Sequence, residues 1–410
     1  MGNISYFCIV KRFISLLRCL SLIICLLPAN NISAQHYVES DLNMDSVEIS
    51  LLTCRPRRNV YSLYGHTAIR IQDKQNHLDM AVNYGMFSFD KPFFILRFVF
   101  GLTDYSMDIE DFEAFRIYYA TRGAGVKQQT LNLRKEEKKA IIDAIIKNYE
   151  PQNRVYRYNY FYDNCTTRAR DILLDNINGT IRYQTRNKNS ESYREMIHDY
   201  NEQQRWARFG NDLLLGIKAD FPTNHEQQQF LPDNLRKDFD NAVVIDKNGQ
   251  KRALVSNSSW VVLPGTQAEW SGFPLSPTTC AIIFFVIVVA VSIYERCKIK
   301  MFWGMDIFLM LLTGLCGLIL LAMVFSQHPT VRVNLQILLL NPISLIFLYP
   351  TVKCLRRNII HRWLMAWMIL IVLFLIGGFF QSYAEGMTIV ALSLLIRYIL
   401  KFDQIVRTRK

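Results

Sequence analysis

Hydrophobic and polar positions divide the chain into two parts with different patterns. After Pro277 the apolar residues gather into five long runs, at residues 278–294, 307–325, 335–352, 363–380 and 387–400. About 20 apolar residues cross a bilayer as a helix, and shorter runs cross where flanking residues reach the headgroups or the bilayer thins. The pattern therefore predicts an all-α bundle of five transmembrane helices within residues 277–410.

Before Pro277 the apolar runs are shorter and are separated by polar turns, which is typical of a folded domain outside the membrane. Their spacing predicts strands at 47–53, 67–71, 78–84, 126–133 and 155–162, and helices at 111–121, 134–149, 193–209 and 211–217. We therefore expect an α+β domain over residues 35–255. Residues 256–276 read as a linker whose tryptophans, Trp260 and Trp270, suit the surface of a bilayer.

One run, Phe93 to Phe100, is apolar and aromatic. It suits either a buried core segment or a lip that dips into lipid. Because many domains bury such runs and Arg97 interrupts this one, we expect the core position.

The first 34 residues have the pattern of a secretory signal. Basic residues precede the apolar run Cys19 to Leu27, and a small-residue stretch ending at Ala34 follows it, so we expect cleavage after Ala34. The alternative is an uncleaved anchor over Phe13 to Leu27, which is short for a membrane helix. In both cases the next domain is exported.

The basic residues predict the orientation of the membrane part. With residues 35–255 outside, the Lys-rich and Arg-rich segments 296–300, 353–362 and 397–410 all fall on the inner side, as the positive-inside rule requires. The pattern predicts a multi-pass membrane protein with the domain over residues 35–255 on the outer side. The formal net charge of +12 is then largely a topology signal and gives no reason to expect nucleic acid as a partner.

Of the nine cysteines, only Cys54 and Cys165 fall in the exported domain. Cys165 follows Asp163 and Asn164, either of which can cap a helix that begins there. The free amide groups and the dipole of a helix start favour thiolate over thiol. The alternative is a disulfide between Cys54 and Cys165, which would silence the nucleophile. The position of Cys165 at a helix start argues against it, so we expect Cys54 to be structural. No paired Cys and His spacing suggests a metal site.

A nucleophilic cysteine needs a base, and His66 is the candidate because the Gly65 turn places it at the start of a strand. A lone cysteine is commonly a small buried hydrophobe and a lone histidine commonly a structural residue. The residues by themselves leave open whether Cys165 and His66 are catalytic or structural.

The motifs YGHTAIRI (64–71) and YDNCTTRARD (162–171), with NYGMFSFD between them, resemble the Lnb N-terminal periplasmic domain family, which is named for a bacterial lipoprotein N-acyltransferase. The resemblance covers most of residues 47–255 and extends distantly to permuted papain-like thiol acyltransferases. It implies a permuted papain-like fold with Cys165 as nucleophile and His66 as base. Asn83 is the expected third, orienting group, and His77 and Asp79 are the alternatives.

Candidate substrate-binding residues lie in two places. Tyr64, Asn164 and Arg168 flank the expected dyad, and the basic loop 55–58 could attract headgroups. In the membrane half, the outward loop 326–334 is the densest polar cluster. Its residues His328, Arg332 and Asn334 suit a site for a lipid headgroup or an acceptor amine, with an ordinary interfacial loop as the alternative.

The resemblance implies a membrane lipoprotein N-acyltransferase. It would move an acyl chain from a phospholipid, through a Cys165 thioester, to the N-terminal diacylglyceryl-cysteine of lipoproteins. No cofactor is expected, because the donor is already an activated ester. The alternatives are an envelope cysteine peptidase or amidase that acts on peptidoglycan peptides, and a non-enzymatic membrane scaffold. The five apolar runs favour a lipid substrate.

Overall fold

Seven antiparallel strands form the frame of the exported domain. The structure is a computed structural model that describes residues 43–88, 92–183, 191–267 and 272–409, so the expected signal segment lies outside the described residues. In spatial order the strands are β10 (Val255–Val262), β5 (Val126–Leu131), β1 (Val47–Cys54), β2 (His66–Asp73), β3 (Leu78–Met86), β4 (Asp104–Asp111) and β6 (Val155–Arg157). Every neighbouring pair is antiparallel.

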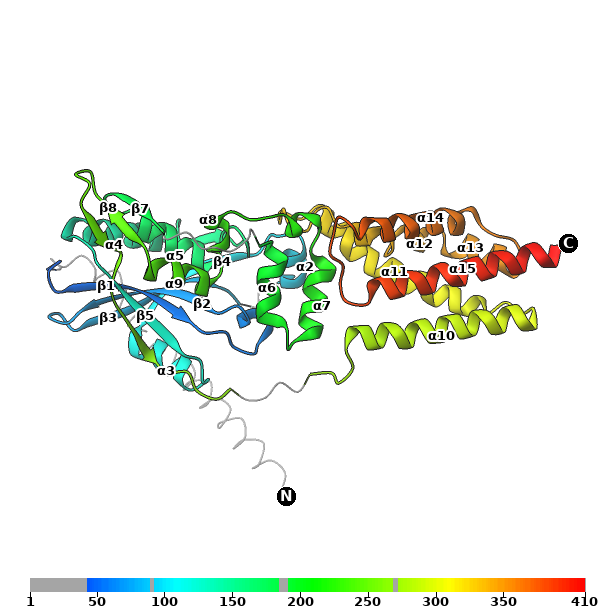
Figure 1. Cartoon of the computed structure of the whole chain (residues 1–410), viewed down its shortest axis with the longest axis horizontal. Helices are drawn as coiled ribbons and strands as arrows, with labels where there is room; N and C mark the ends of the chain where they lie inside the picture. Colours follow the sequence, from blue (N-terminus) through cyan, green and yellow to red (C-terminus); the bar gives the residue numbers. More distant parts are fainter. Residues whose placement is uncertain (1–42, 89–91, 184–190, 268–271, 410) are drawn as a thin grey trace, which may run out of the picture. The chain divides into compact units, whose positions relative to one another are not determined.

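Helices cover both faces of this sheet. Thr67 on β2 shares a hydroxyl hydrogen bond of 3.0 Å with Thr166 on helix α5 (Cys165–Leu174). The next residue, Ala68, packs in a cluster with Phe112 and Phe115 of helix α3 (Phe112–Ala120). Because successive strand residues point to opposite faces, α5 and α3 lie on opposite sides of the sheet. Helices α4 (Lys135–Tyr149) and α9 (Pro232–Asp240) lie on the α5 side (Figure 1).

Several boundaries differ from the sequence-based expectation. The strand expected at 155–162 ends at Arg157, and the rest is a turn that leads into α5. Strand β10 takes up residues 256–262 of the expected linker, because they pair with β5. Trp260 accordingly lies on the sheet, with Lys127 Nζ 5.7 Å from its ring centroid. Trp270 lies outside the described residues.

Smaller elements complete the domain. They are η2 (Val60–Ser62), α2 (Phe94–Val99), α6 (Tyr193–Asn201), α7 (Arg205–Leu214), η3 (Ile217–Asp220), α8 (His225–Gln228), and a second sheet of β7 (Thr180–Arg182), β8 (Val243–Ile245) and β9 (Lys251–Ala253). The single helices expected at 193–209 and 211–217 are thus α6, a break, α7 and η3.

Helix α2 corrects the expectation that residues 93–100 lie in the core. None of its residues is buried, and Phe93 and Ile95 are each 78% exposed. Apolar composition alone cannot distinguish a segment that faces the protein interior from one that faces lipid. Because these side chains are exposed, the expectation that residues 93–100 lie in the core is wrong.

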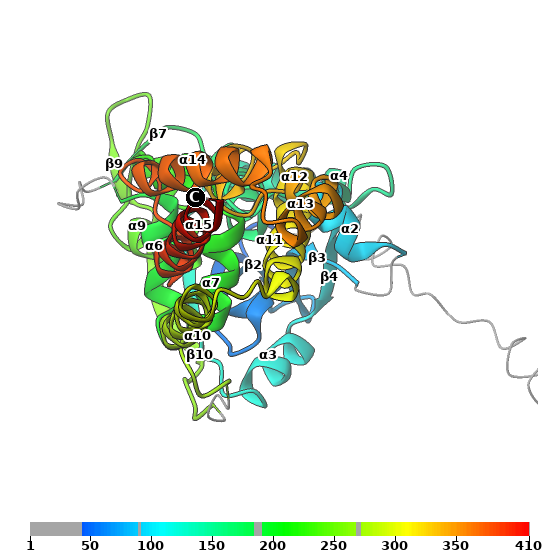
Figure 2. The same ribbon diagram turned by 90° about the vertical axis from the view of Figure 1, so that its right-hand side faces the viewer.

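The chain after residue 276 is helical, as predicted. It contains α10 (Pro277–Lys298), α11 (Trp303–Val324), η4 (Leu335–Leu338), α12 (Ile343–Ile346), α13 (Leu348–Arg356), α14 (Arg362–Gly377) and α15 (Met387–Arg409). Among the described residues, α10 and α11 are long and apolar enough to cross a membrane. The pair 335–346 and 348–356, bent by 77°, is a possible third span. Figure 2 shows α15 between α10 and α14. A count of five spans is not confirmed.

Four buried charges join three of these helices. On α15, Arg397 Nε lies 2.9 Å from Asp306 of α11, and Lys401 Nζ lies 2.5 Å from the same carboxylate. Arg397 also pairs with Glu295 of α10 at 3.2 Å. All four residues are almost inaccessible to solvent. Because two cations meet two anions, the cluster is neutral, as burial requires.

The exported domain and the helical region share a hydrophobic core. Phe161 and Phe230 from the domain pack in one cluster with Met323 at the end of α11 and Val331 in the following loop. Residues 44–410 accordingly form one compact unit. The segment that leads into Cys165 is therefore supported directly by the helical region.

Candidate active site

The start of α5 is held by Asn164. Its side-chain oxygen accepts hydrogen bonds from the amides of Thr166 and Thr167 at 2.8 and 2.9 Å, which caps the helix. Its side-chain nitrogen donates to the carbonyls of Tyr160 and Phe230 at 2.8 and 2.9 Å. Asn164 thus fixes the position of Cys165, the first residue of the helix.

Cys165 lies beside His66, the first residue of β2, and each residue shifts the pKa of the other. Burial raises the pKa of the thiol, but the charge and hydrogen bond of His66 lower it, with help from the Thr67 amide and the Thr166 hydroxyl. The net pKa is below the usual value. Burial lowers the pKa of His66, whereas Cys165 and Asn83 raise it above its usual value. The surroundings therefore favour a thiolate beside an imidazolium.

Asn83 on β3 is the third member of the group. His66 Nε2 lies 3.0 Å from the Asn83 side-chain oxygen, and the Asn83 side-chain nitrogen donates to Glu110 Oε1 of β4 at 2.8 Å. A carboxylate only accepts, so Glu110 orients the amide with its oxygen toward His66. Neutral His66 then carries its proton on Nε2, which leaves Nδ1 to accept a proton from the thiol.

The two alternatives for the third residue have other surroundings. His77 is exposed in the turn between β2 and β3. Asp79 binds Arg70 through two hydrogen bonds of 2.7 and 2.5 Å. Of the three candidates, Asn83 is the one in contact with His66.

Gly85 and Cys54 further define the surroundings of Cys165. Gly85, with φ +81°, lies against it, and a Cβ built on Gly85 would stand 3.4 Å from the Cys165 Cβ. The missing side chain leaves room beside Cys165. Cys54 and Cys165 are both free thiols, and Cys54 is fully buried on β1 with its pKa raised, mainly by burial. This is the environment of an inert cysteine.

The residues expected to bind substrate beside the dyad make contacts within the protein. The hydroxyl of Tyr64 accepts hydrogen bonds from Asn211 at 2.6 Å and Asn201 at 3.4 Å, and burial raises its pKa to about 12. Arg168 binds both oxygens of Asp163 and lies 3.6 Å above the Tyr156 ring. These contacts support the turn that holds Cys165.

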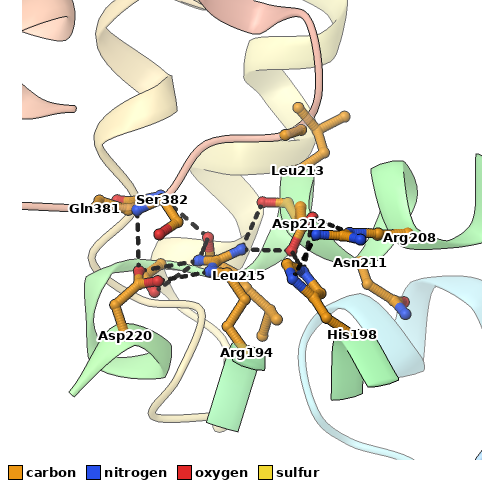
Figure 3. Close-up of polar contacts among 12 residues, drawn as sticks. Arg194, His198, Arg208, Asn211, Asp212, Leu213, Leu215, Asp220, Gln381 and Ser382 are labelled. Atoms are coloured by element: carbon orange, nitrogen blue, oxygen red, sulfur yellow. Dashed lines mark hydrogen bonds and ion pairs between the residues drawn. The ribbon is translucent and has the colours of Figure 1, made fainter. Parts of the chain in front are cut away.

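The outward loops dock onto residues 212–220 of the domain, a segment that the buried guanidinium of Arg194 on α6 holds in place (Figure 3). Arg194 lies 2.8 Å from both Asp212 and Asp220 and also donates to the carbonyls of Leu215 and Gly216. Gln381, from the loop before α15, donates to the same Leu215 carbonyl at 3.1 Å. We call this network the joint.

Asn334 is part of the joint, because it donates to the Leu213 carbonyl and accepts from Gln381 at 2.9 Å. Arg332 is exposed and its Nε donates to the Ser326 carbonyl at 2.7 Å. His328 lies near α2, with its ring 6.4 Å from that of Phe98. Among the residues that the structure describes, no hydrogen bond or ion pair joins these three to Cys165 or His66.

Glu110 is the site residue that the sequence analysis missed. It lies on β4, where Tyr105, Met107 and Ile109 alternate with polar residues. This period of two is a strand signal, and the register that pairs Asn83 with Asp108 then brings Glu110 near Asn83. The pattern was therefore present in the sequence.

Comparison with protein families gives two matches that together span most of the chain. Residues 33–200 match the Lnb N-terminal periplasmic domain, and residues 267–409 match the Lnb transmembrane domain. Comparisons with curated proteins and with solved structures give no match. The two matches occur in the order of the exported domain and the helical region described above.

Proposed function

This chain belongs to an Lnb-type family of bacterial membrane proteins with a periplasmic domain, and on that premise we propose that it is a lipoprotein N-acyltransferase. The observation that carries the proposal is the group Cys165, His66 and Asn83. A thiol with a lowered pKa stands at a helix start, beside a histidine that an asparagine orients. This arrangement suits acyl transfer through a thioester, as in a permuted papain-like thiol enzyme.

In the first half of the reaction, His66 takes the proton of Cys165, and the thiolate attacks the ester carbonyl of a membrane phospholipid. The backbone amide at the start of α5 would bind the oxyanion. The ester C–O bond then breaks, His66 returns its proton to the departing glycerol oxygen, and a lysophospholipid leaves. The acyl chain stays on Cys165 as a thioester.

In the second half, the α-amino group of a diacylglyceryl-cysteine lipoprotein attacks the thioester. His66 accepts the proton that the amine loses, and the C–S bond breaks as the amide forms. The proton on His66 then neutralises the Cys165 thiolate. Both halves exchange one acyl bond for another, so the reaction needs no oxidant, reductant or cofactor.

The proposal includes the membrane arrangement. The five apolar segments of the helical region would all cross or enter the inner membrane, with the bent pair as one segment. His328 and Arg332 remain candidates for contact with a headgroup or the acceptor amine. We assign Asn334 to the joint, because its amide is occupied by Leu213 and Gln381.

The test is to trap the acyl-enzyme. The purified full chain, incubated with dipalmitoyl phosphatidylethanolamine vesicles, should gain the mass of one palmitoyl group on the peptide that carries Cys165, and hydroxylamine should remove it. Cys165→Ala and His66→Ala should gain nothing, whereas Cys54→Ala should behave as wild type. Cleavage of peptidoglycan peptides without any acyl adduct would instead favour the peptidase. Mass spectrometry of lipoprotein N-termini from cells with and without the gene tests the second half.

A further inference from the structure

Helix α2 displays an apolar surface beside the outer end of a membrane span. Phe93 and Ile95 are 78% exposed, Leu96 is 55% exposed and Phe98 is 45% exposed. Four large apolar side chains on one short segment, exposed together, usually mark a contact with a partner or with lipid.

The charged residue of this segment, Arg97, is bonded to the sheet and to the following loop. Arg97 binds Asp104 of β4 at 2.7 Å and also donates to the Leu102 carbonyl. Asp104 in turn binds Arg157 of β6 at 2.9 Å. These bonds hold α2 to the sheet by its charged residue, so the apolar side chains are presented outward by a fixed support.

The position of α2 selects lipid as the partner. The amide of Gln327, just beyond the end of α11, donates to the Phe100 carbonyl at 2.9 Å. Helix α11 is one of the two helices that are long and apolar enough to span the membrane, and Phe325 at its end is 70% exposed. A segment bonded to the outer end of a span stands at the level where headgroups meet acyl chains, and apolar side chains there enter lipid.

A row of aromatic rings leads from α2 toward the thiol. Phe98 stacks on Phe94 with centroids 6.5 Å apart, and Phe94 stacks on Phe87 at 5.8 Å. Phe87 lies 4.9 Å from Tyr105, which stacks on Tyr158 at 4.1 Å.

The row ends beside Cys165. The Tyr158 ring lies 3.5 Å from the position of a Cβ on Gly85, and the Cys165 Cβ lies 3.4 Å from that same position. The rings therefore form a continuous row of contacts from α2 to Tyr158, beside the thiol.

We propose that α2 inserts into the outer leaflet and that the acyl chain of the donor lipid lies along this aromatic row, so that its ester carbonyl reaches Cys165. The inference rests on the proposed acyl transfer and adds the route of the lipid. A phospholipid ester lies near the headgroups, and an apolar track lets the chain leave the leaflet without exposure to water.

Photocrosslinking tests the membrane contact independently of activity. A photoreactive benzoylphenylalanine at Ile95 of the full chain, in vesicles that contain tritiated phosphatidylethanolamine, should become labelled with lipid. The same probe at Ile117 on α3, an exposed isoleucine of the same domain, should not. Equal labelling at both positions, or crosslinking of Ile95 to a lipoprotein in place of lipid, would overturn the proposal.

Kinetics test the track. Ile95→Glu should lower acyl-enzyme formation from phospholipid vesicles by about tenfold or more but leave the reaction with soluble p-nitrophenyl acetate unchanged. Phe87→Asn should likewise lower the ratio of palmitoyl to acetyl transfer. Ile117→Glu is the matched control. If wild type acylates Cys165 from vesicles and both variants match it, the route is wrong and acyl transfer stands. If wild type reacts with no phospholipid, the proposed function itself fails.

Discussion

Glu110 accepts a hydrogen bond of 2.8 Å from the side-chain nitrogen of Asn83, and this bond decides which end of the amide faces His66. The two residues lie on neighbouring strands, β4 and β3. Glu110 thus acts on the reaction through Asn83 and His66, so it is a positioning residue.

We expect Glu110→Ala to lower acyl-enzyme formation by about 10- to 100-fold, because the freed amide can turn its nitrogen toward His66 and disfavour the productive tautomer. Glu110→Gln should recover little, because its amide can also donate. The measurement is the single-turnover rate with p-nitrophenyl acetate and its dependence on pH. Asp108→Ala, an exposed change on the same strand, should stay near the wild-type rate. Equal loss in both variants would indicate a general effect on the strand.

Asn83 itself can be separated from its two alternatives. Asn83→Ala should lower the same rate by about 100-fold, since His66 loses its orienting partner. His77→Ala should have no effect, because the residue is exposed in a turn. Asp79→Ala should lower thermal stability, through the loss of its bonds to Arg70, and change the rate little. A rate defect in the His77 variant, with Asn83→Ala active, would reassign the third residue.

The reactivity of Cys165 should depend on pH in a direction that His66 sets. The thiolate exists above the lowered pKa of Cys165, and the ion pair persists until the pH passes the raised pKa of His66. Iodoacetamide should therefore alkylate Cys165 rapidly even below about pH 9, the ordinary pKa of a cysteine thiol.

In His66→Ala the largest causes that lower the thiol pKa are removed, while burial still raises it and the Thr67 amide and Thr166 hydroxyl remain. When the alkylation rate is measured from roughly pH 5 to 10, the pH at which the rate is half-maximal should be higher in this variant than in wild type. The buried Cys54 should react slowly in both proteins. An unchanged midpoint in the variant would argue against the dyad.

The joint provides a stability prediction with its own control. Arg194→Met should destabilise the full chain in detergent by about 3 kcal/mol, because Asp212 and Asp220 lose a buried partner. Arg205→Ala removes an exposed pair with Glu385 across the same joint and should cost less than about 1 kcal/mol. Denaturant titration of both variants measures the difference. Equal stabilities would remove the structural role given to Arg194.

The orientation of the helical region can be tested with reporters. A periplasm-active reporter fused after Asn334 should be active, and one fused after Arg357 should be inactive, because the basic segment at 353–362 favours the cytoplasm. A cytoplasm-active reporter should give the reverse. Opposite results would remove the candidate site from the periplasm.

The sequence grouped the residues of the candidate site more accurately than it predicted the architecture. Cys165, His66 and Asn83 could be named because each stands in a short motif whose local structure, a capped helix or a strand start, follows from adjacent residues. Glu110 was missed because no strand was predicted at β4, although Tyr105 and Met107 alternate with polar residues there.

Other features depended on tertiary contacts that no local pattern contains. The run at Phe93 reads as core because burial and lipid contact favour the same side chains, and the exposure that separates them is a property of the folded chain. Likewise, Asn334 looks like a ligand-binding residue in the sequence. Its partners, Leu213 and Gln381, lie far away along the chain.

The four buried charges of the helical region have a consequence for biosynthesis. A lone helix that carried Arg397 and Lys401 into lipid would face the cost of two unpaired cations there. Helices α10 and α11 emerge from the ribosome first and already hold Glu295 and Asp306. Both counter-charges are therefore already in place when α15 leaves the translocon. A chain truncated before α15 would instead keep Glu295 and Asp306 without their cations, and we expect the cell's quality control to recognise it.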